Sequence, residues 1–121
     1  MNIALCQVNP IVGAYNYNRD LILKYYQDCI KLNSDIIVFP ELVISGYPPQ
    51  DLLWEEGFVD ENLVILQDII DQSTTPLILG YIRKDGQHLY NSAAVCYNGQ
   101  LQSSYDKVLL PTYDVFDEDR Y

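Results

Sequence analysis

Basic residues are scarce in this sequence of 121 residues: seven lysines and arginines stand against 17 aspartates and glutamates, a net charge of −10. Binding to the phosphate backbone of a nucleic acid, or to an anionic membrane surface, depends on clustered lysine and arginine. The shortage of these residues argues against both kinds of partner. An acidic surface of this kind mainly keeps a protein soluble.

Long apolar runs are also missing, because no segment reaches the about 18 consecutive apolar residues that a membrane-spanning helix needs. The first residues, Met1 to Leu5, have no basic segment ahead of an apolar stretch and so do not resemble a signal peptide. The sequence therefore predicts a cytoplasmic protein without a membrane segment, whose first residues form a strand.

Cysteine and histidine are few, with three cysteines and one histidine. Cys6, Cys29 and Cys96 lie within apolar patterns and lack the spacing of metal ligands, so we expect buried free thiols. His88 falls on an expected strand with no nucleophile elbow beside it. The sequence therefore predicts no metal site and no serine–histidine or cysteine–histidine pair.

Apolar runs and helical spacing alternate along the chain, which predicts one α/β domain with a mixed sheet and helices on one or both faces. The expected strands lie at 3–8, 36–39, 77–82, 89–97 and 101–105. Apolar residues at helical spacing within 22–30 and 59–70 predict two helices, each with one buried face. Asn16 or Asn18 can cap the first helix through its side-chain oxygen. Asp85-Gly86 and Asn98-Gly99 predict hairpin turns.

A glutamate directly follows one buried strand, in Phe39-Pro40-Glu41-Leu42. Ligands of open α/β sheets bind at the carboxyl ends of the strands, and Pro40 ends the strand's hydrogen bonding there. Glu41 is therefore a candidate general base. For an isolated glutamate, a solvated loop carboxylate is the alternative.

A lysine lies at the end of the last expected strand, in Tyr105-Asp106-Lys107-Val108. Its apolar stem can pack while the ammonium reaches a cleft, where it would stabilise a developing oxyanion. The alternative is a surface lysine paired with Asp106.

Aromatic and acidic residues are interspersed over 113–121, which suits a polar ligand site with apolar walls. The spacing fits no calcium loop, because the turn glycine is missing. A solvated acidic turn is the alternative for this segment.

Taken together, these segments resemble the carbon–nitrogen hydrolase (nitrilase) superfamily. The resemblance rests on Ile3-Ala4-Leu5-Cys6-Gln7-Val8-Asn9-Pro10, Phe39-Pro40-Glu41-Leu42, Tyr105-Asp106-Lys107 and Leu110-Pro111. Within the superfamily, 45–53 and 110–121 are most similar to the glutaminase domains of glutamine-dependent NAD synthetases. The resemblance implies a nitrilase-type α-β-β-α sandwich, of which residues 1–121 would form an incomplete, N-terminal portion.

The resemblance also implies a Glu–Lys–Cys triad that hydrolyses glutamine to glutamate. Glu41 matches the general base and Lys107 matches the lysine that stabilises the tetrahedral intermediate. The positions that match the glutamine pocket are Tyr47, Tyr113, Phe116 and Glu118. The glutaminase domain needs no cofactor; ATP and Mg are implied only for a separate synthetase domain, which uses the ammonia to amidate deamido-NAD.

The family's nucleophilic cysteine follows the lysine by some tens of residues, whereas Cys6, Cys29 and Cys96 all precede Lys107. We therefore expect the 121-residue chain to lack both the nucleophile and the synthetase domain, and not to hydrolyse glutamine alone. We also expect an uncovered apolar sheet surface and an exposed strand edge, and therefore either self-association into a homo-oligomer or marginal stability. The alternatives are a fragment of another amidase or nitrilase, and a non-catalytic interaction module on the same scaffold.

Overall fold

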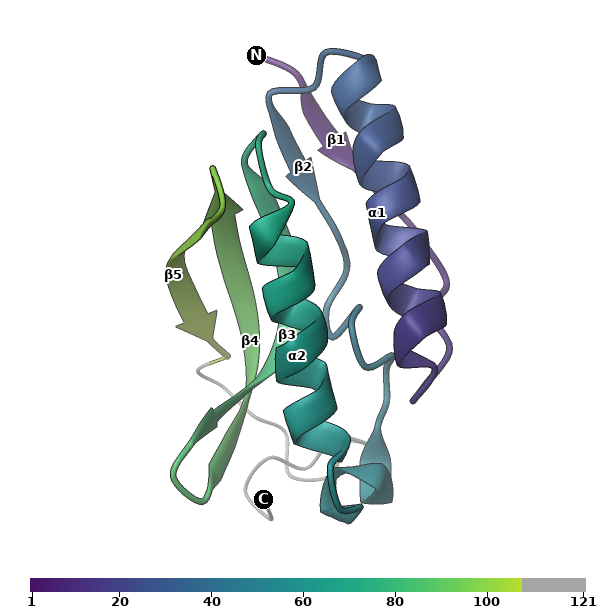
Figure 1. The fold of residues 1–121 in the computed structure, drawn as a ribbon, viewed down its shortest axis with the longest axis vertical. Helices are drawn as coiled ribbons and strands as arrows, with labels where there is room; N and C mark the ends of the chain where they lie inside the picture. Colours follow the sequence, from purple (N-terminus) through teal and green to yellow (C-terminus); the bar gives the residue numbers. More distant parts are fainter. Residues whose placement is uncertain (108–121) are drawn as a thin grey trace.

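Two helices lie on one face of a five-stranded mixed sheet in the computed structural model, which describes residues 1–107 (Figure 1). The strand order in the sheet follows the chain order. Strands β1, β2 and β3 are parallel, whereas β4 is antiparallel to both β3 and β5. The elements are β1 (Ile3–Leu5), α1 (Tyr15–Lys31), β2 (Ile36–Val38), the 3-10 helix η1 (Gln50–Trp54), α2 (Phe58–Asp71), β3 (Leu77–Asp85), β4 (His88–Tyr97) and β5 (Gln100–Asp106).

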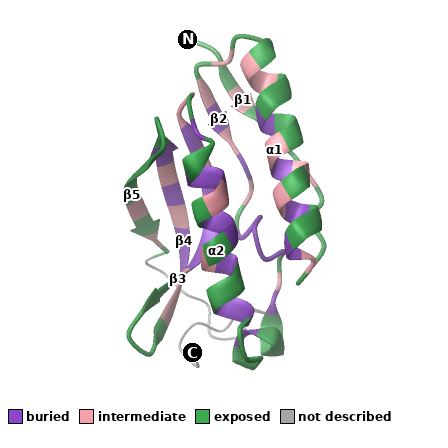
Figure 2. Cartoon of the chain, in the orientation of Figure 1, coloured by how far each residue is buried: buried purple, intermediate pink, exposed green. Residues whose placement is uncertain are grey.

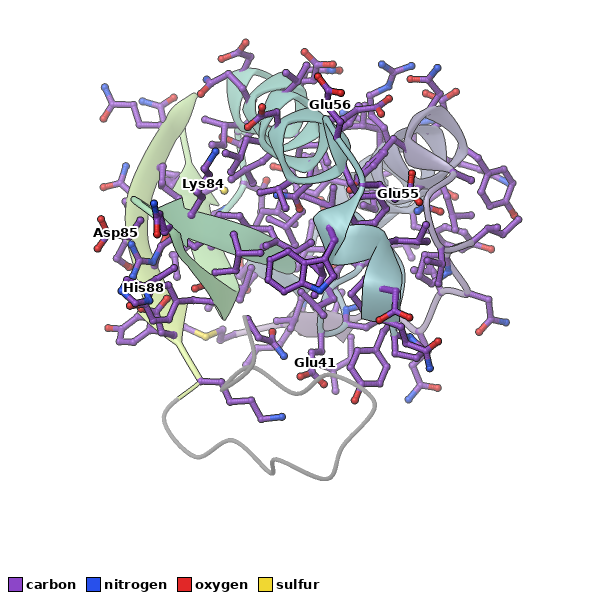
Figure 3. All side chains as sticks on the ribbon, turned by 90° about the horizontal axis from the view of Figure 1, so that it is seen from below. Glu41, Glu55, Glu56, Lys84, Asp85 and His88 are labelled. Atoms are coloured by element: carbon purple, nitrogen blue, oxygen red, sulfur yellow. The ribbon has the colours of Figure 1, made fainter. Side chains whose placement is uncertain are left out.

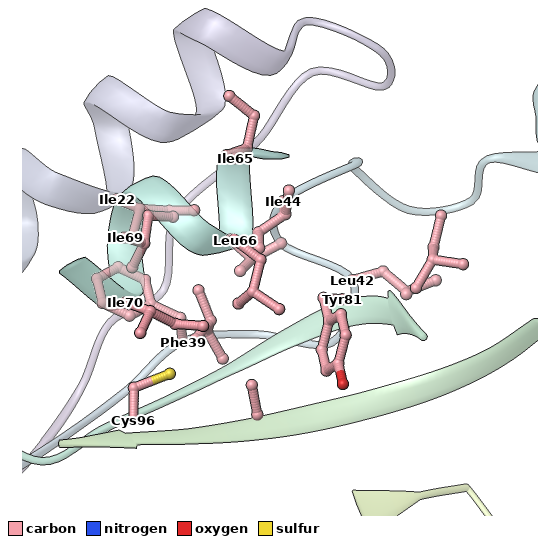
Figure 4. Close-up of a cluster of buried hydrophobic side chains, with 14 of the residues drawn as sticks. Ile22, Phe39, Leu42, Ile44, Ile65, Leu66, Ile69, Ile70, Tyr81 and Cys96 are labelled. Carbon is pink, nitrogen blue, oxygen red and sulfur yellow. The ribbon is translucent and has the colours of Figure 1, made fainter. Parts of the chain in front are cut away.

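The core lies between the sheet and the inner faces of the helices (Figure 2). Leu66, Ile69 and Ile70 of α2 face the sheet, at the spacing expected for an amphipathic helix (Figure 4). Leu77 and Leu79 of β3 are fully buried in the same cluster. The predicted periodicity therefore identified the helix face that packs on the sheet.

The predicted cap of the first helix is wrong. Helix α1 begins at Tyr15 after Ala14, which makes no side-chain cap, so Asn18 falls inside the helix. The fully buried Asn18 amide instead accepts a hydrogen bond from Ile11 N–H at 2.8 Å and donates to Ile44 O at 2.9 Å. A buried amide needs such partners, and here they join the segment before α1 to the loop after β2.

Both predicted hairpins are present, and the second has the predicted turn geometry. Asn98 and Gly99 have φ of 54° and 77°, as a two-residue type I′ turn requires. In the first hairpin Asp85 pairs with His88, so β3 continues three residues past the predicted end at Ile82. The β3–β4 hairpin is therefore the longest part of the sheet.

The 3-10 helix η1, which precedes α2, buries only part of its apolar surface. Trp54 is 61% exposed, whereas Leu53 is buried at 4%. Leu53 is therefore the residue of η1 that joins the hydrophobic core.

The segment after β2 continues beside β3 without forming a strand. Gly80 N–H donates to Pro40 O at 3.2 Å, and Ile44 N–H donates to Gly80 O at 3.5 Å. The backbones approach so closely that a Cβ on Gly80 would lie 2.1 Å from the backbone nitrogen of Leu42. A glycine at position 80 thus allows the Glu41 segment to pack on β3.

The sheet face opposite the helices carries exposed apolar side chains in the described part of the chain. Leu5 is 73% exposed and Tyr105 is 70% exposed. Ile3 of β1 is 58% exposed. This open sheet face agrees with the prediction of uncovered apolar surface. Among the described residues, neither α1 nor α2 has the length and apolar content of a membrane-spanning helix.

We predict that Gly80→Ala moves the Glu41 segment off β3, because the added methyl group meets backbone rather than a flexible side chain. Overpacking of this kind costs about 1–3 kcal/mol of unfolding free energy. Urea denaturation followed by circular dichroism measures the loss. Ser103→Ala, at an exposed position of β5, is the control and should change the free energy by less than about 0.5 kcal/mol. Equal stability of the two variants would contradict the close approach.

Candidate active site

Glu41 and Lys107, which are 66 residues apart in sequence, lie together in the structure. Lys107 Nζ is 3.5 Å from Glu41 Oε1. Figure 3 places Glu41 on the side of the molecule away from the helices, whereas Glu56 lies beside them. Glu41 is therefore not an isolated loop carboxylate, and the pair lies at the open sheet face.

Strand β4 contributes Asn91, which touches both parts of this pair. Its side-chain Nδ2 donates a short hydrogen bond to Glu41 Oε1, and its backbone oxygen accepts one from Lys107 N–H at 2.9 Å. Asn91 is 5% exposed. The sequence analysis missed this residue; the available signal was an amide at a buried position of a strand that is otherwise mostly apolar.

Asp106 pairs with Arg83 and not with Lys107, the partner considered in the sequence analysis. Arg83 of β3 donates to both of its carboxylate oxygens, at 2.9 and 2.7 Å, and Ser92 Oγ donates a short hydrogen bond to Oδ1. The bond from Arg83, and next that from Ser92, lowers the pKa of Asp106 below its usual value. This clamp fixes the end of β5, so the residue after it, Lys107, begins from a defined position.

Glu41 borders two hollows. One, of about 380 Å³, has walls from β2, β3 and β4 and from the end of β5, and includes Asn91 and Lys107. The other, of about 350 Å³, lies against Asn9, Pro10 and Tyr47. A carboxylate between two cavities can contact a reacting group in either of them. A third cavity, of about 600 Å³, is larger than either hollow; it lies between η1, α2 and the β3–β4 hairpin, and neither Glu41 nor Lys107 lines it.

The structure thus brings together three of the residues singled out in the sequence, Glu41, Lys107 and Tyr47, the last as a wall of the second hollow. The remaining predicted pocket residues, Tyr113, Phe116 and Glu118, lie outside the described residues.

None of the three cysteines lines either hollow at Glu41. Cys6 Sγ and Cys29 Sγ are 3.4 Å apart, and Cys96 is buried in the core. Burial, followed by the contact with Cys29, raises the pKa of Cys6 to about 12, and burial raises that of Cys96 to about 11. These two thiols therefore stay protonated at neutral pH, which is unfavourable for a nucleophile.

A metal-binding cluster does not occur in the part of the chain that the structure describes: no three His, Cys, Asp or Glu side chains come together there. The single histidine, His88, is exposed at the start of β4, with its ring 6.4 Å from that of Tyr90. The described residues of the candidate site supply a carboxylate, an amide and an ammonium group.

Comparison with known proteins assigns this arrangement to a family. The sequence profile described as carbon-nitrogen hydrolase matches residues 2–121. The glutamine-dependent NAD(+) synthetase of Synechocystis is 37% identical over 98% of this chain, which spans 23% of that relative. The chain thus covers about a fifth of the length of such curated relatives.

Solved structures agree with the sequence comparison. The glutamine-dependent NAD+ synthetase of Acinetobacter baumannii superposes with a TM-score of 0.90 at 32% identity, over 98% of this chain and 23% of its own. An amidase from Nesterenkonia superposes with a TM-score of 0.83 at 22% identity, over 98% of this chain and 46% of its own. The predicted nitrilase-type α/β fold is confirmed, with this chain corresponding to the N-terminal portion of the family.

The Asp106 clamp predicts a specific acid sensitivity. Because the folded-state pKa of Asp106 lies below its unfolded value of about 3.9, its contribution to stability is complete above that value. The contribution is lost as the pH falls below that value and through the folded-state pKa. We expect Asp106→Asn to be less stable at pH 7 by about 1–3 kcal/mol, and to lose less stability than the unmodified chain on acidification.

Urea midpoints at pH 7, 5 and 3 measure this effect. Asp51→Asn, a change at an exposed carboxylate of η1, is the control and should keep the acid sensitivity of the unmodified chain. Identical pH dependence of the two variants would show that the Arg83–Asp106 pair contributes nothing to folding.

Proposed function

Because the chain belongs to the carbon–nitrogen hydrolase family, we propose that it supplies two catalytic residues of a site that hydrolyses the side-chain amide of glutamine. The observation that carries the proposal is the contact of Glu41 with Lys107 at 3.5 Å, at the positions that match the family's base and lysine. The name of the relatives, glutamine-dependent NAD(+) synthetase, favours glutamine as the substrate. Since the chain covers about a fifth of those relatives, the activity is proposed for the whole protein.

Glu41 is the general base in this proposal. Its carboxylate takes the proton from a cysteine thiol, and the resulting thiolate attacks the carbonyl carbon of the glutamine amide. The C–N bond then breaks and the nitrogen leaves as ammonia, carrying the proton that Glu41 had taken. Water adds to the thioester in the same way and releases glutamate and the thiol.

Lys107 is the electrostatic partner. Its ammonium group lies beside the carboxylate that activates the nucleophile, so it is within reach of the oxygen on which negative charge develops. The clamp on Asp106 holds the backbone from which Lys107 extends. An ammonium group in a fixed position stabilises that charge without reorganisation during the reaction.

The nucleophile is a thiol other than Cys6, Cys29 and Cys96, which lie away from Glu41's hollows. Tyr47 forms part of the glutamine pocket, together with Tyr113, Phe116 and Glu118, the positions that match the family's pocket. The released ammonia serves a synthetase domain of the whole protein, which uses ATP and Mg.

We predict that Glu41→Gln and Lys107→Ala each lower glutamine hydrolysis at least about 100-fold in the polypeptide that the complete gene encodes. Ammonia release from glutamine is the measurement. Glu56→Gln and Lys31→Ala remove the same charges at exposed positions away from the site and should leave the rate unchanged. Activity on other amides but not on glutamine would favour an ordinary amidase. No activity on any amide would favour the non-catalytic module.

The open sheet face also supports a proposal about assembly: copies of this 121-residue chain associate through it. We predict a mass above that of the monomer in light scattering, falling on dilution. Leu5→Lys places a charge where the side chain is 73% exposed, so it should shift the chain towards monomer. Leu32→Lys, at a residue 75% exposed at the end of α1, is the control. A monodisperse monomer at all concentrations would contradict the proposal.

A further inference from the structure

Asn91 is a buried polar residue of β4 whose side chain contacts Glu41. Its side chain leaves β4 towards Glu41, whereas that of the next residue, Ser92, binds Asp106. Successive strand residues point to opposite faces, so β4 contacts the Glu41 side of the site and the Asp106 clamp from adjacent positions. At 5% exposure, the Asn91 amide has little access to solvent and depends on protein partners.

The two oxygens of Glu41 are in different surroundings. Asn91 Nδ2 donates to Oε1, and Lys107 Nζ also lies 3.5 Å from Oε1. Among residues 1–107, no hydrogen bond is made to Oε2. Within the described residues, the carboxylate is thus held through Oε1 by both donors.

We propose that Asn91 is a positioning residue for the general base, which fixes Glu41 through Oε1 so that Oε2 is the oxygen that accepts and returns the proton. This inference rests on the proposed function and names the part of the site that no sequence pattern identified. Two donors on Oε1 make it the less basic oxygen, while holding the plane of the carboxylate fixed. A base held in one orientation contributes more to the rate than one that rotates freely.

An amide is suited to this position because it donates a hydrogen bond without carrying charge. A lysine or arginine there would pair with Glu41 and compete with Lys107, and a carboxylate would repel it. The backbone of Asn91 performs a second task, because its oxygen accepts from Lys107 N–H at 2.9 Å. One residue of β4 therefore sets the positions of both the base and the lysine.

Side-chain substitutions separate these two tasks, since the backbone bond to Lys107 remains in any variant. In the polypeptide of the complete gene, we expect Asn91→Ala to lower kcat for glutamine hydrolysis about 10- to 100-fold with little change in KM. Asn91→Asp keeps the shape but replaces the donor by a negative charge. Its kcat should fall as well, and the acid limb of its pH–kcat/KM profile should move to higher pH.

Asn98→Asp is the matched control, because it makes the same chemical change at an exposed turn position at the other end of β4. It should keep both kcat and the pH profile. A residue that only stabilised the fold would lower the amount of folded enzyme and its melting temperature, without moving the pH profile of the enzyme that remains. Unchanged kcat and an unchanged profile in both Asn91 variants, with Glu41→Gln inactive, would overturn the positioning role and leave the proposed function intact.

A measurement that does not depend on activity tests the contact between Asn91 and Glu41 if the protein hydrolyses no amide. In the 121-residue chain, the NMR signals of the Asn91 side-chain NH2 group should shift as Glu41 is protonated, and this pH-dependent shift should vanish in Glu41→Gln. Such a shift would support the contact even if no amide were hydrolysed. Asn91 signals that are insensitive to pH, or a shift that persists in Glu41→Gln, would overturn the proposal.

Discussion

The close approach of the Glu41 segment to β3 is the constraint on which the candidate site depends. Strand β2 ends at Val38, yet the chain stays against β3 for several more residues because Gly80 presents no Cβ to the backbone of Leu42. Hydrogen bonds between Gly80 and the residues on either side of Glu41 hold this arrangement. The carboxylate is thereby placed by two strands rather than by a free loop, which is what a fixed catalytic base requires.

Strand direction and length explain how Glu41 meets Lys107. Strands β2 and β5 run the same way on either side of the β3–β4 hairpin. Val38 pairs with Ile78 on one side, and Asp106 pairs with Ser92 on the other, which itself pairs with Tyr81. Strand β2 thus ends three β3 residues before β5 does, but the segment after β2 continues along β3 to Gly80, so Glu41 and Lys107 lie over the same part of the hairpin. The long hairpin is therefore the platform of the site.

Local patterns in the sequence were enough to predict the fold and the two site residues Glu41 and Lys107. The other contacts of the site depend on how the strands pair, which local patterns do not show. Asn98-Gly99 was recognisable as a turn because both residues must adopt positive φ, and Glu41 because it follows a buried strand. The roles of Asn18 and Asn91 depend on which residues lie opposite them in three dimensions. The same holds for Asp106, whose partner Arg83 is 23 residues away. No local pattern contains that information; for Asn91 and Asp106, a shift of one residue in strand register would turn the side chain to the other face of the sheet.

The short distance between Glu41 and Lys107 does not by itself give this pair its full electrostatic effect. The side chains of Lys107 and Glu41 are 39% and 46% exposed, so water screens the attraction between them. Covering the open sheet face would remove that water and strengthen every charge interaction at the site, including the one with a developing oxyanion. The exposed apolar residues of the same face favour such covering, because their burial lowers the free energy. The open sheet face is thus also the surface whose burial would strengthen the electrostatic effect of the carboxylate and the ammonium group.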